Sequence, residues 1–151
     1  MAQSLARLWT HLIFSTKERY PFLSDQKIRN DNHRYLATVL RSHDCETIIV
    51  GGCADHVHAL FALSRNHSIA DIVRETKRTS STWIKTIERR HSKFRWQAGY
   101  GAFSVSQSHV GQVQTYIENQ EKHHRRKTFQ DEFRAFLKKY RIDFDERYIW
   151  D

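Results

Sequence analysis

Hydrophobic positions along the chain follow two spacings, and these predict where strands and helices lie. Three short segments rich in aromatic and β-branched residues are typical of strands, and they span 8–14, 47–51 and 57–63. A fourth strand is expected at the end of the glycine-containing segment 94–106. The pair Gly51 and Gly52 is expected to break or bulge the second strand.

Between and after these strands, apolar residues recur three to four positions apart, which predicts amphipathic helices. Each predicted helix follows a serine or threonine that can cap its first turn. The expected caps are Ser24 for a helix to about Ser42, Ser68 for a second with apolar positions to Ile87, Ser108 for a third to about His124, and Thr128 for a fourth over 129–140.

The predicted order is strand, helix, strand, strand, helix, strand, and then helices. This β-α-β-β-α-β order is typical of a ferredoxin-like or RRM-like fold of the mixed α/β (α+β) class. We therefore expect an antiparallel sheet with helices packed on one face, plus C-terminal helices. The 151 residues suit one domain spanning 1–151.

Composition favours a polyanionic partner and an intracellular location. The formal net charge is +8, which favours a nucleic acid, although an anionic membrane surface attracts the same charge. No apolar run approaches eighteen residues and the N-terminus lacks a signal-peptide core, so we expect no membrane association. Cys45 and Cys53 lie eight positions apart on an extended segment, roughly 26 Å, which is too far for a disulfide and suggests reduced cytosolic thiols.

Two histidines stand on the third predicted strand with one residue between them. Because side chains alternate along a strand, His56 and His58 share one face, while Val57 and Phe61 share the opposite, apolar face. The apolar face is expected to be the core side, so the histidines should lie where a substrate could bind. Two ordinary surface histidines are the alternative, and the His-x-His pattern alone is weak in a chain with ten histidines.

Tyr116 and Gln120 lie one turn apart on the third predicted helix and so share a face. Two imidazoles and an amide oxygen suit a divalent ion such as Mn²⁺ or Mg²⁺, with positions left open for phosphate oxygens and water. A tyrosine can act as a nucleophile in phosphoryl transfer, because phenoxide is also a workable leaving group. Spacing alone leaves open the alternative that Tyr116 only packs on the sheet.

Aromatic and cationic residues alternate in several places, as in proteins that stack bases and bind phosphates of single strands. The third helix also ends in a cationic run, which the helix dipole by itself would favour. The adjacent His123 and His124 diverge by about 100° on a helix, so both are interpreted as phosphate contacts or surface rather than as metal ligands. The candidate DNA-binding residues are Lys77, Arg78, Arg95, Trp96, Tyr100, His123, His124 and Arg125.

Taken together, these motifs resemble the single-tyrosine HUH transposases of small bacterial insertion sequences, including the REP-associated tyrosine transposases. The resemblance covers nearly the whole chain. The matching segments are 14–17 (FSTK), 55–58 (DHVH), 96–100 (WQAGY), 103–106 (FSVS), 116–120 (YIENQ) with His123-His124, and 140–150 (YRIDFDERYIW).

The resemblance implies roles for four residues: His56, His58 and Gln120 as ligands of Mg²⁺ or Mn²⁺, and Tyr116 as the nucleophile. It also implies a homodimer, in which the tyrosine helix of one subunit can complete the other's site. The implied substrate is single-stranded DNA with hairpins, cleaved through a 5′-phosphotyrosine intermediate that leaves a free 3′-hydroxyl. The implied location is the bacterial cytoplasm, in association with the nucleoid.

Two other functions are compatible with the same motifs. A domesticated module could bind hairpin DNA or RNA without strand transfer, although it would have no need of this combination of histidines, glutamine and tyrosine. A relaxase-like or initiator-like nickase would use related chemistry, although such enzymes are usually larger. A covalent adduct that depends on Tyr116 would separate the binding module from both enzymes.

Overall fold

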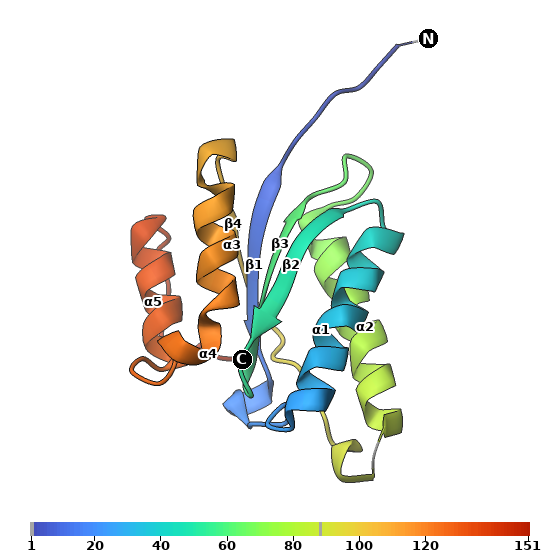
Figure 1. Ribbon diagram of the computed structural model, residues 1–151. Coiled ribbons are helices and arrows are strands. Elements are labelled where there is room, and N and C mark those ends of the chain that lie inside the picture. Colours follow the sequence, from blue (N-terminus) through green and yellow to red (C-terminus); the bar gives the residue numbers. More distant parts are fainter. Residues whose placement is uncertain (1, 88) are drawn as a thin grey trace.

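The computed structural model describes residues 2–87 and 89–151, and its centre is a four-stranded antiparallel sheet (Figure 1). The strands are β1 (Trp9–Ser15), β2 (Glu46–Gly52), β3 (His56–Ala62) and β4 (Gly101–Ser104), in the order β2-β3-β1-β4. The two central strands are therefore β3 and β1, which pair along their whole length from Trp9 opposite Ala62 to Ser15 opposite His56.

Helices cover both faces of this sheet (Figure 1). One face carries α1 (Gln26–Ser42) and α2 (Ile69–Ile87), and the other carries α3 (Val110–Glu118), α4 (Gln120–His123) and α5 (Phe129–Lys139). Short 3₁₀ turns lie at Lys17–Arg19, Arg89–His91 and Gln107–His109. The expected ferredoxin-like order is confirmed, and the additional C-terminal helices form a third layer.

Strand alternation divides the interior into cores on the two sides of the sheet. Leu12 and Phe61 belong to the core under α1 and α2, whereas Leu60 belongs to the core that includes Ile117 of α3. The prediction that Val57 and Phe61 face a core is confirmed. The expectation of an open face beside the histidines is wrong, because the C-terminal helices bury that face as well.

Several predicted boundaries also need correction. The cap of α1 is Asp25 rather than Ser24, since the Asp25 carboxylate accepts a hydrogen bond from the Ile28 amide at 3.1 Å. The irregularity of β2 lies between Thr47 and Ile49, and the strand continues through Gly52. The third predicted helix is two: a 3₁₀ turn replaces its first residues, and Asn119 (φ −98°, ψ 17°) separates α3 from α4.

Two glycines at the end of β2 allow close backbone approaches, one to β3 and one to the tyrosine-bearing helix α3. Gly52 has φ +146°, and a Cβ there would lie 2.3 Å from the His56 carbonyl oxygen, so only glycine fits. A Cβ on Gly51 would lie 2.9 Å from the Ile117 side chain. The absence of a side chain on Gly51 lets α3 rest on β2, whereas Gly52 allows the close approach to β3.

Two further sequence expectations concern the cysteines and the membrane. Cys45 and Cys53 are both free thiols, as predicted. Among the described residues, none of the helices is long and apolar enough to span a bilayer.

Candidate active site

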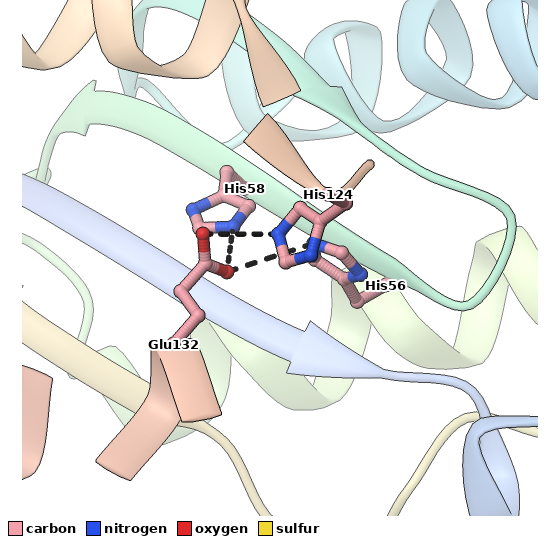
Figure 2. Close-up of side chains that lie close together, drawn as sticks. All are labelled: His56, His58, His124 and Glu132. Carbon is pink, nitrogen blue, oxygen red and sulfur yellow. Dashed lines mark hydrogen bonds and ion pairs between the residues drawn. The ribbon is translucent and has the colours of Figure 1, made fainter. Parts of the chain in front are cut away.

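Four ligand-type side chains meet on the face of β3 that the C-terminal helices cover (Figure 2). His56 and His58 come from neighbouring inward positions of β3, His124 follows α4, and Glu132 comes from α5. One ligand atom from each lies within 4.8 Å of all the others. Both strand histidines are completely buried, and Glu132 is only 1% exposed.

Tyr116 and Gln120 join this cluster through the same carboxylate. The Tyr116 hydroxyl donates a hydrogen bond to Glu132, and the Gln120 amide donates to it at 3.1 Å. The Gln120 carbonyl oxygen lies 3.0 Å from Nε2 of His56. The structure therefore brings together all four residues that the motifs singled out, within one chain.

The hydrogen bonds around a neutral His56 ring leave the lone pair of Nε2 without a hydrogen-bond donor. Nδ1 of His56 lies 2.6 Å from a carboxylate oxygen of Asp55, so that nitrogen carries the hydrogen. In the neutral ring, Nε2 then has a lone pair that faces the Gln120 oxygen, which is also an acceptor. Reversing the amide would only move the conflict to Glu132. Convergent acceptors with a carboxylate behind the imidazole are what a metal cation requires, so the residues fit a divalent ion.

Burial and hydrogen bonds together set the protonation states of His58 and Glu132, and both states suit metal binding. Burial lowers the pKa of His58 to about 4, so its imidazole is neutral at physiological pH. Burial alone would raise the pKa of Glu132, but hydrogen bonds with His124 and His58 outweigh it and lower that pKa well below its usual range. The pKa of Tyr116 is raised by burial and then by the neighbouring carboxylate. Neutral imidazoles and an ionised carboxylate are the forms that bind metals.

Sequence reasoning missed two residues of this site, Glu132 and His11. Nε2 of His11 lies 2.7 Å from Nδ1 of His58, which fixes the orientation of that imidazole. The sequence pattern contains a signal for each of these two residues. His11 lies on β1 two positions before Ile13, which faces the C-terminal helices, and Glu132 lies between Phe129 and Phe133 on the buried stripe of its helix.

The structure changes the interpretation of His124. This side chain was expected at the surface or on a phosphate, but its Nε2 lies 3.0 Å from Glu132. Nε2 of His123 also lies 3.5 Å from the same carboxylate oxygen. The two rings approach one carboxylate although they stand on consecutive residues, with His123 ending α4 and His124 following it.

The structure contradicts the predicted role of Trp96 in base stacking and gives Lys77 a structural role. Trp96 is 8% exposed and donates its indole hydrogen to Ser80 at 2.9 Å, so its predicted stacking on a base is wrong. Lys77 donates to the carbonyl oxygens of Gln97 (2.8 Å) and Gly99 (2.6 Å), which holds that segment against α2 and leaves its ammonium already bonded. Burial also lowers the pKa of Lys77 to about 8.

The other predicted DNA contacts remain at the surface. Tyr100 is 36% exposed, and it lines a shallow depression with the exposed Arg78 and Arg95. Arg78 also donates to Glu75 at 2.7 Å. These three side chains are accessible to a ligand on the α2 side of the sheet.

A cavity of about 890 Å³ opens beside Tyr116, and we call it the basic cavity. Its lining combines the tyrosine with four cationic side chains and contains no acidic residue. The lining residues are Tyr116, Asn119, Lys122, His123, Arg125, Arg126 and Lys127. Tyr116 therefore separates the buried Glu132 cluster from a cationic cavity.

Comparisons with known proteins agree with this architecture. The model of the family described as "Transposase IS200 like" matches residues 4–120. The ISDra2 transposase TnpA of Deinococcus radiodurans is 26% identical over 115 residues, which cover 73% of this chain and 81% of that protein. The family model spans the sheet, the two histidines and the tyrosine helix.

Two solved structures share the fold. A candidate transposase from Deinococcus radiodurans R1 superposes with a TM-score of 0.62 at 26% identity, covering 80% of this chain and 95% of that one. A REP-associated tyrosine transposase bound to a REP hairpin superposes with a TM-score of 0.51 at 13% identity, covering 80% of this chain and 70% of that one. The second likeness concerns the fold alone.

The chain belongs to the IS200-like transposases, since the family model covers more than three quarters of it. It is therefore a transposase, and its class is that of DNA-cleaving enzymes. The family resemblance that the sequence motifs predicted is confirmed.

Proposed function

We propose that this transposase cleaves and rejoins single-stranded DNA at hairpin-bearing element ends, with Tyr116 as nucleophile and a divalent metal held by His56, His58 and Gln120. The observation that carries the proposal is the position of the Tyr116 hydroxyl. It touches the buried histidine and glutamate cluster on one side and borders the basic cavity on the other. A phosphate drawn into that cavity would reach both the nucleophile and the metal ligands.

In the proposed reaction, the Tyr116 oxygen attacks the scissile phosphorus and the bond to the 3′ oxygen breaks. The products are a 5′-phosphotyrosine and a free 3′-hydroxyl, and attack of such a hydroxyl on the phosphotyrosine rejoins strands. Because both bonds are phosphodiesters, the exchange is close to energy-neutral and needs no nucleotide cofactor. Tyr116 donates to Glu132 before attack, so the hydroxyl is oriented and its proton faces an ionised acceptor.

A bound Mg²⁺ or Mn²⁺ would polarise the scissile phosphate and offset the charge that develops on its oxygens. The residues of this chain supply the rest. Asp55 holds the His56 ring through Nδ1, and His11 holds the His58 ring in the same way. Burial excludes water around the two imidazoles, which strengthens their interaction with a cation.

A hairpin substrate is proposed from the fold and the charge distribution. The REP-associated relative with the same fold was solved with a REP hairpin. The basic cavity and the exposed group of Arg78, Arg95 and Tyr100 lie on opposite sides of the sheet. A DNA molecule with a duplex stem and a single-stranded flank could contact both, with the flank entering the cavity.

We propose that the protein forms the homodimer implied by the family resemblance. In such a dimer, Tyr116 could act on the metal site of its own subunit or on that of the other subunit. Within one chain, the ring centroids of His58 and Tyr116 are 5.8 Å apart, so one chain suffices to form the site. Mixing a Tyr116→Phe subunit with a His58→Ala subunit would test the arrangement. Recovery of activity in the mixture would indicate that tyrosine and histidines act across two subunits.

The test of the proposed function is a denaturing gel of the protein with labelled, hairpin-bearing single-stranded DNA, with and without Mn²⁺ or Mg²⁺. The expected result is a metal-dependent adduct that protease digestion removes. Binding without any adduct, across several hairpins, would instead favour the hairpin-binding module. Formation of a circular junction from two element ends would separate transposition from simple nicking.

We expect DNA binding to weaken steeply with salt, because the cations of the basic cavity contact phosphates. Four contacts to a single strand give a slope of about −3 in log affinity against log salt. Replacing Arg125 and Arg126 together by Ala should reduce that slope by about 1.4, measured by fluorescence anisotropy over a salt series.

The matched control removes two cations from α1, on the other side of the sheet. Lys27→Ala with Arg34→Ala changes the net charge equally, and both side chains are at least 80% exposed. An equal fall in slope for both double variants would show that only net charge matters and would contradict a phosphate path through the basic cavity.

A further inference from the structure

We propose that His124 and Glu132 complete the metal centre, so that one carboxylate both binds the ion and holds the nucleophilic hydroxyl. The inference rests on the proposed function, in which His56 and His58 bind a divalent metal. It changes the expected ligand set, since the motifs pointed to two imidazoles and the Gln120 amide. The added ligands come from the segment after α4 and from α5, which the family model does not cover.

The first argument is the position of a carboxylate in an apolar environment. Glu132 lies on the buried face of α5 between Phe129 (2% exposed) and Phe133 (3% exposed). An ionised carboxylate in such a place is unfavourable unless a cation or several hydrogen bonds compensate. Its ion-pair partners among the described residues are all histidines, and the proposed ligands His56 and His58 must be neutral to bind metal. A metal ion at their meeting point would supply positive charge that the two neutral imidazoles do not.

The second argument is the direction of the His124 lone pair. Nδ1 of His124 lies 2.6 Å from the Lys127 carbonyl oxygen, which only accepts, so this nitrogen carries the hydrogen. The other ring nitrogen, Nε2, therefore faces Glu132 at 3.0 Å, and it is the atom that can bind a cation in place of a proton. His56 has the same arrangement, with Asp55 behind its ring. A ring nitrogen fixed by an oxygen acceptor, with its partner nitrogen aimed at a shared point, is the usual geometry of a metal-binding histidine.

The third argument is the division of labour between the two oxygens of Glu132. Oε1 faces the strand histidines, at 2.8 Å from Nε2 of His58 and 3.6 Å from Nε2 of His56. Oε2 faces Tyr116, together with Gln120 and His124. A carboxylate that binds the ion through one side can thus keep its hydrogen bond to the tyrosine through the other, which fixes the nucleophile relative to the metal.

The ligand set has a consequence for metal choice. With His124 and Glu132 added to His56, His58 and Gln120, the set contains three imidazoles and one carboxylate beside the amide. Such nitrogen-rich sets are typical of sites for Mn²⁺, Co²⁺ or Zn²⁺, whereas Mg²⁺ prefers oxygen ligands and water. We therefore expect the protein without DNA to bind Mn²⁺ at least about tenfold more tightly than Mg²⁺. A site made only of two imidazoles and an amide would have no anionic ligand and would bind both ions weakly before DNA arrives.

The test measures metal binding rather than cleavage. Mn²⁺ is titrated into the full-length protein without DNA by isothermal calorimetry, and Co²⁺ is added in parallel to record its visible absorption. Glu132→Gln keeps the shape of the side chain and one acceptor oxygen, but it replaces the other oxygen with an amide donor and removes the charge. We expect it to lower Mn²⁺ affinity at least about tenfold, since even outer-shell partners of a metal change affinity by about that factor.

Matched controls separate ligand loss from general effects. Asp131→Asn makes the same chemical change at the neighbouring position of α5, where the side chain is 60% exposed, and should leave Mn²⁺ affinity unchanged. His124→Ala removes the other proposed ligand, whose side chain is 10% exposed and lies outside the sheet. This variant can therefore test the inference if Glu132→Gln does not fold. Circular dichroism and the thermal midpoint establish folding for each variant.

The outcomes distinguish this inference from the proposed function. Wild-type affinity in folded Glu132→Gln or in folded His124→Ala would overturn the inference, while a Tyr116-dependent adduct in the same preparations would leave the proposed function standing. Loss of Mn²⁺ binding in both variants, with no loss in Asp131→Asn, would support it. A wild-type protein that binds no divalent ion and forms no adduct would overturn both.

Discussion

Tyr116→Phe is expected to eliminate the covalent protein–DNA adduct while leaving hairpin binding close to that of the wild type. The substitution removes one oxygen atom, and that oxygen is the atom proposed to bond to phosphorus. The ring is retained, so its contacts with His58 (5.8 Å between centroids) and Phe136 (5.9 Å) persist. The measurement is a denaturing gel with labelled hairpin DNA in the presence of Mn²⁺, alongside an anisotropy titration for binding.

The matched control for this prediction is Tyr35→Phe. Tyr35 stacks on Trp83 between α1 and α2, on the side of the sheet that faces away from the site. Loss of the Tyr35 hydroxyl should leave the amount of covalent adduct unchanged. Persistence of a protease-sensitive adduct in Tyr116→Phe would mean that another residue is the nucleophile, and it would remove the central element of the proposed mechanism.

His58→Ala is expected to reduce cleavage by a factor of about a thousand or more, while hairpin binding stays within about tenfold of the wild type. Loss of a metal ligand removes several kcal/mol of transition-state stabilisation, and each 1.4 kcal/mol is a factor of ten in rate. Binding is retained because phosphate contacts supply most of the affinity. Single-turnover cleavage rates and anisotropy titrations give the two quantities separately.

A structural effect of this substitution is expected and can be measured. Removing the imidazole leaves His11 and one oxygen of Glu132 without their partner, which costs about 1–3 kcal/mol of folding free energy. His91→Ala is the control, because His91 is also buried, at 4% exposure, but lies in the 3₁₀ turn after α2. If His58→Ala loses binding together with cleavage while His91→Ala keeps both, His58 has a structural part in the DNA site.

The sequence predicted the parts of the fold that depend on local spacing. The alternation of Val57 and Phe61 with the two histidines correctly assigned the two faces of β3, because side-chain direction along a strand follows from backbone geometry alone. The positions of the helices followed from apolar repeats in the same way. Boundaries were less accurate, since competing caps such as Ser24 and Asp25 differ only in which side chain reaches the first turn.

The sequence also identified His56, His58, Tyr116 and Gln120 as one group, although the two pairs are about sixty positions apart. Residue spacing alone indicated that the two histidines share one face of a strand and that Tyr116 and Gln120 share one face of a helix. The family resemblance then placed the two pairs in one site. The interruption at Asn119 was not predicted, yet Tyr116 and Gln120 still reach the same carboxylate. Their shared direction therefore survives a change in helix geometry between them.

What the sequence determined by itself is the strand order, the side of β3 that carries the histidines, and the residues that resemble a transposase site. What only the tertiary structure decided is that α5 covers that face and inserts Glu132 between His56, His58 and Tyr116. Periodicity is a property of a few consecutive residues, whereas the docking of α5 depends on how Phe129 and Phe133 fill the space beside the sheet. A carboxylate on an apolar helix face is visible in the sequence, but its partners are set by packing between segments more than seventy residues apart.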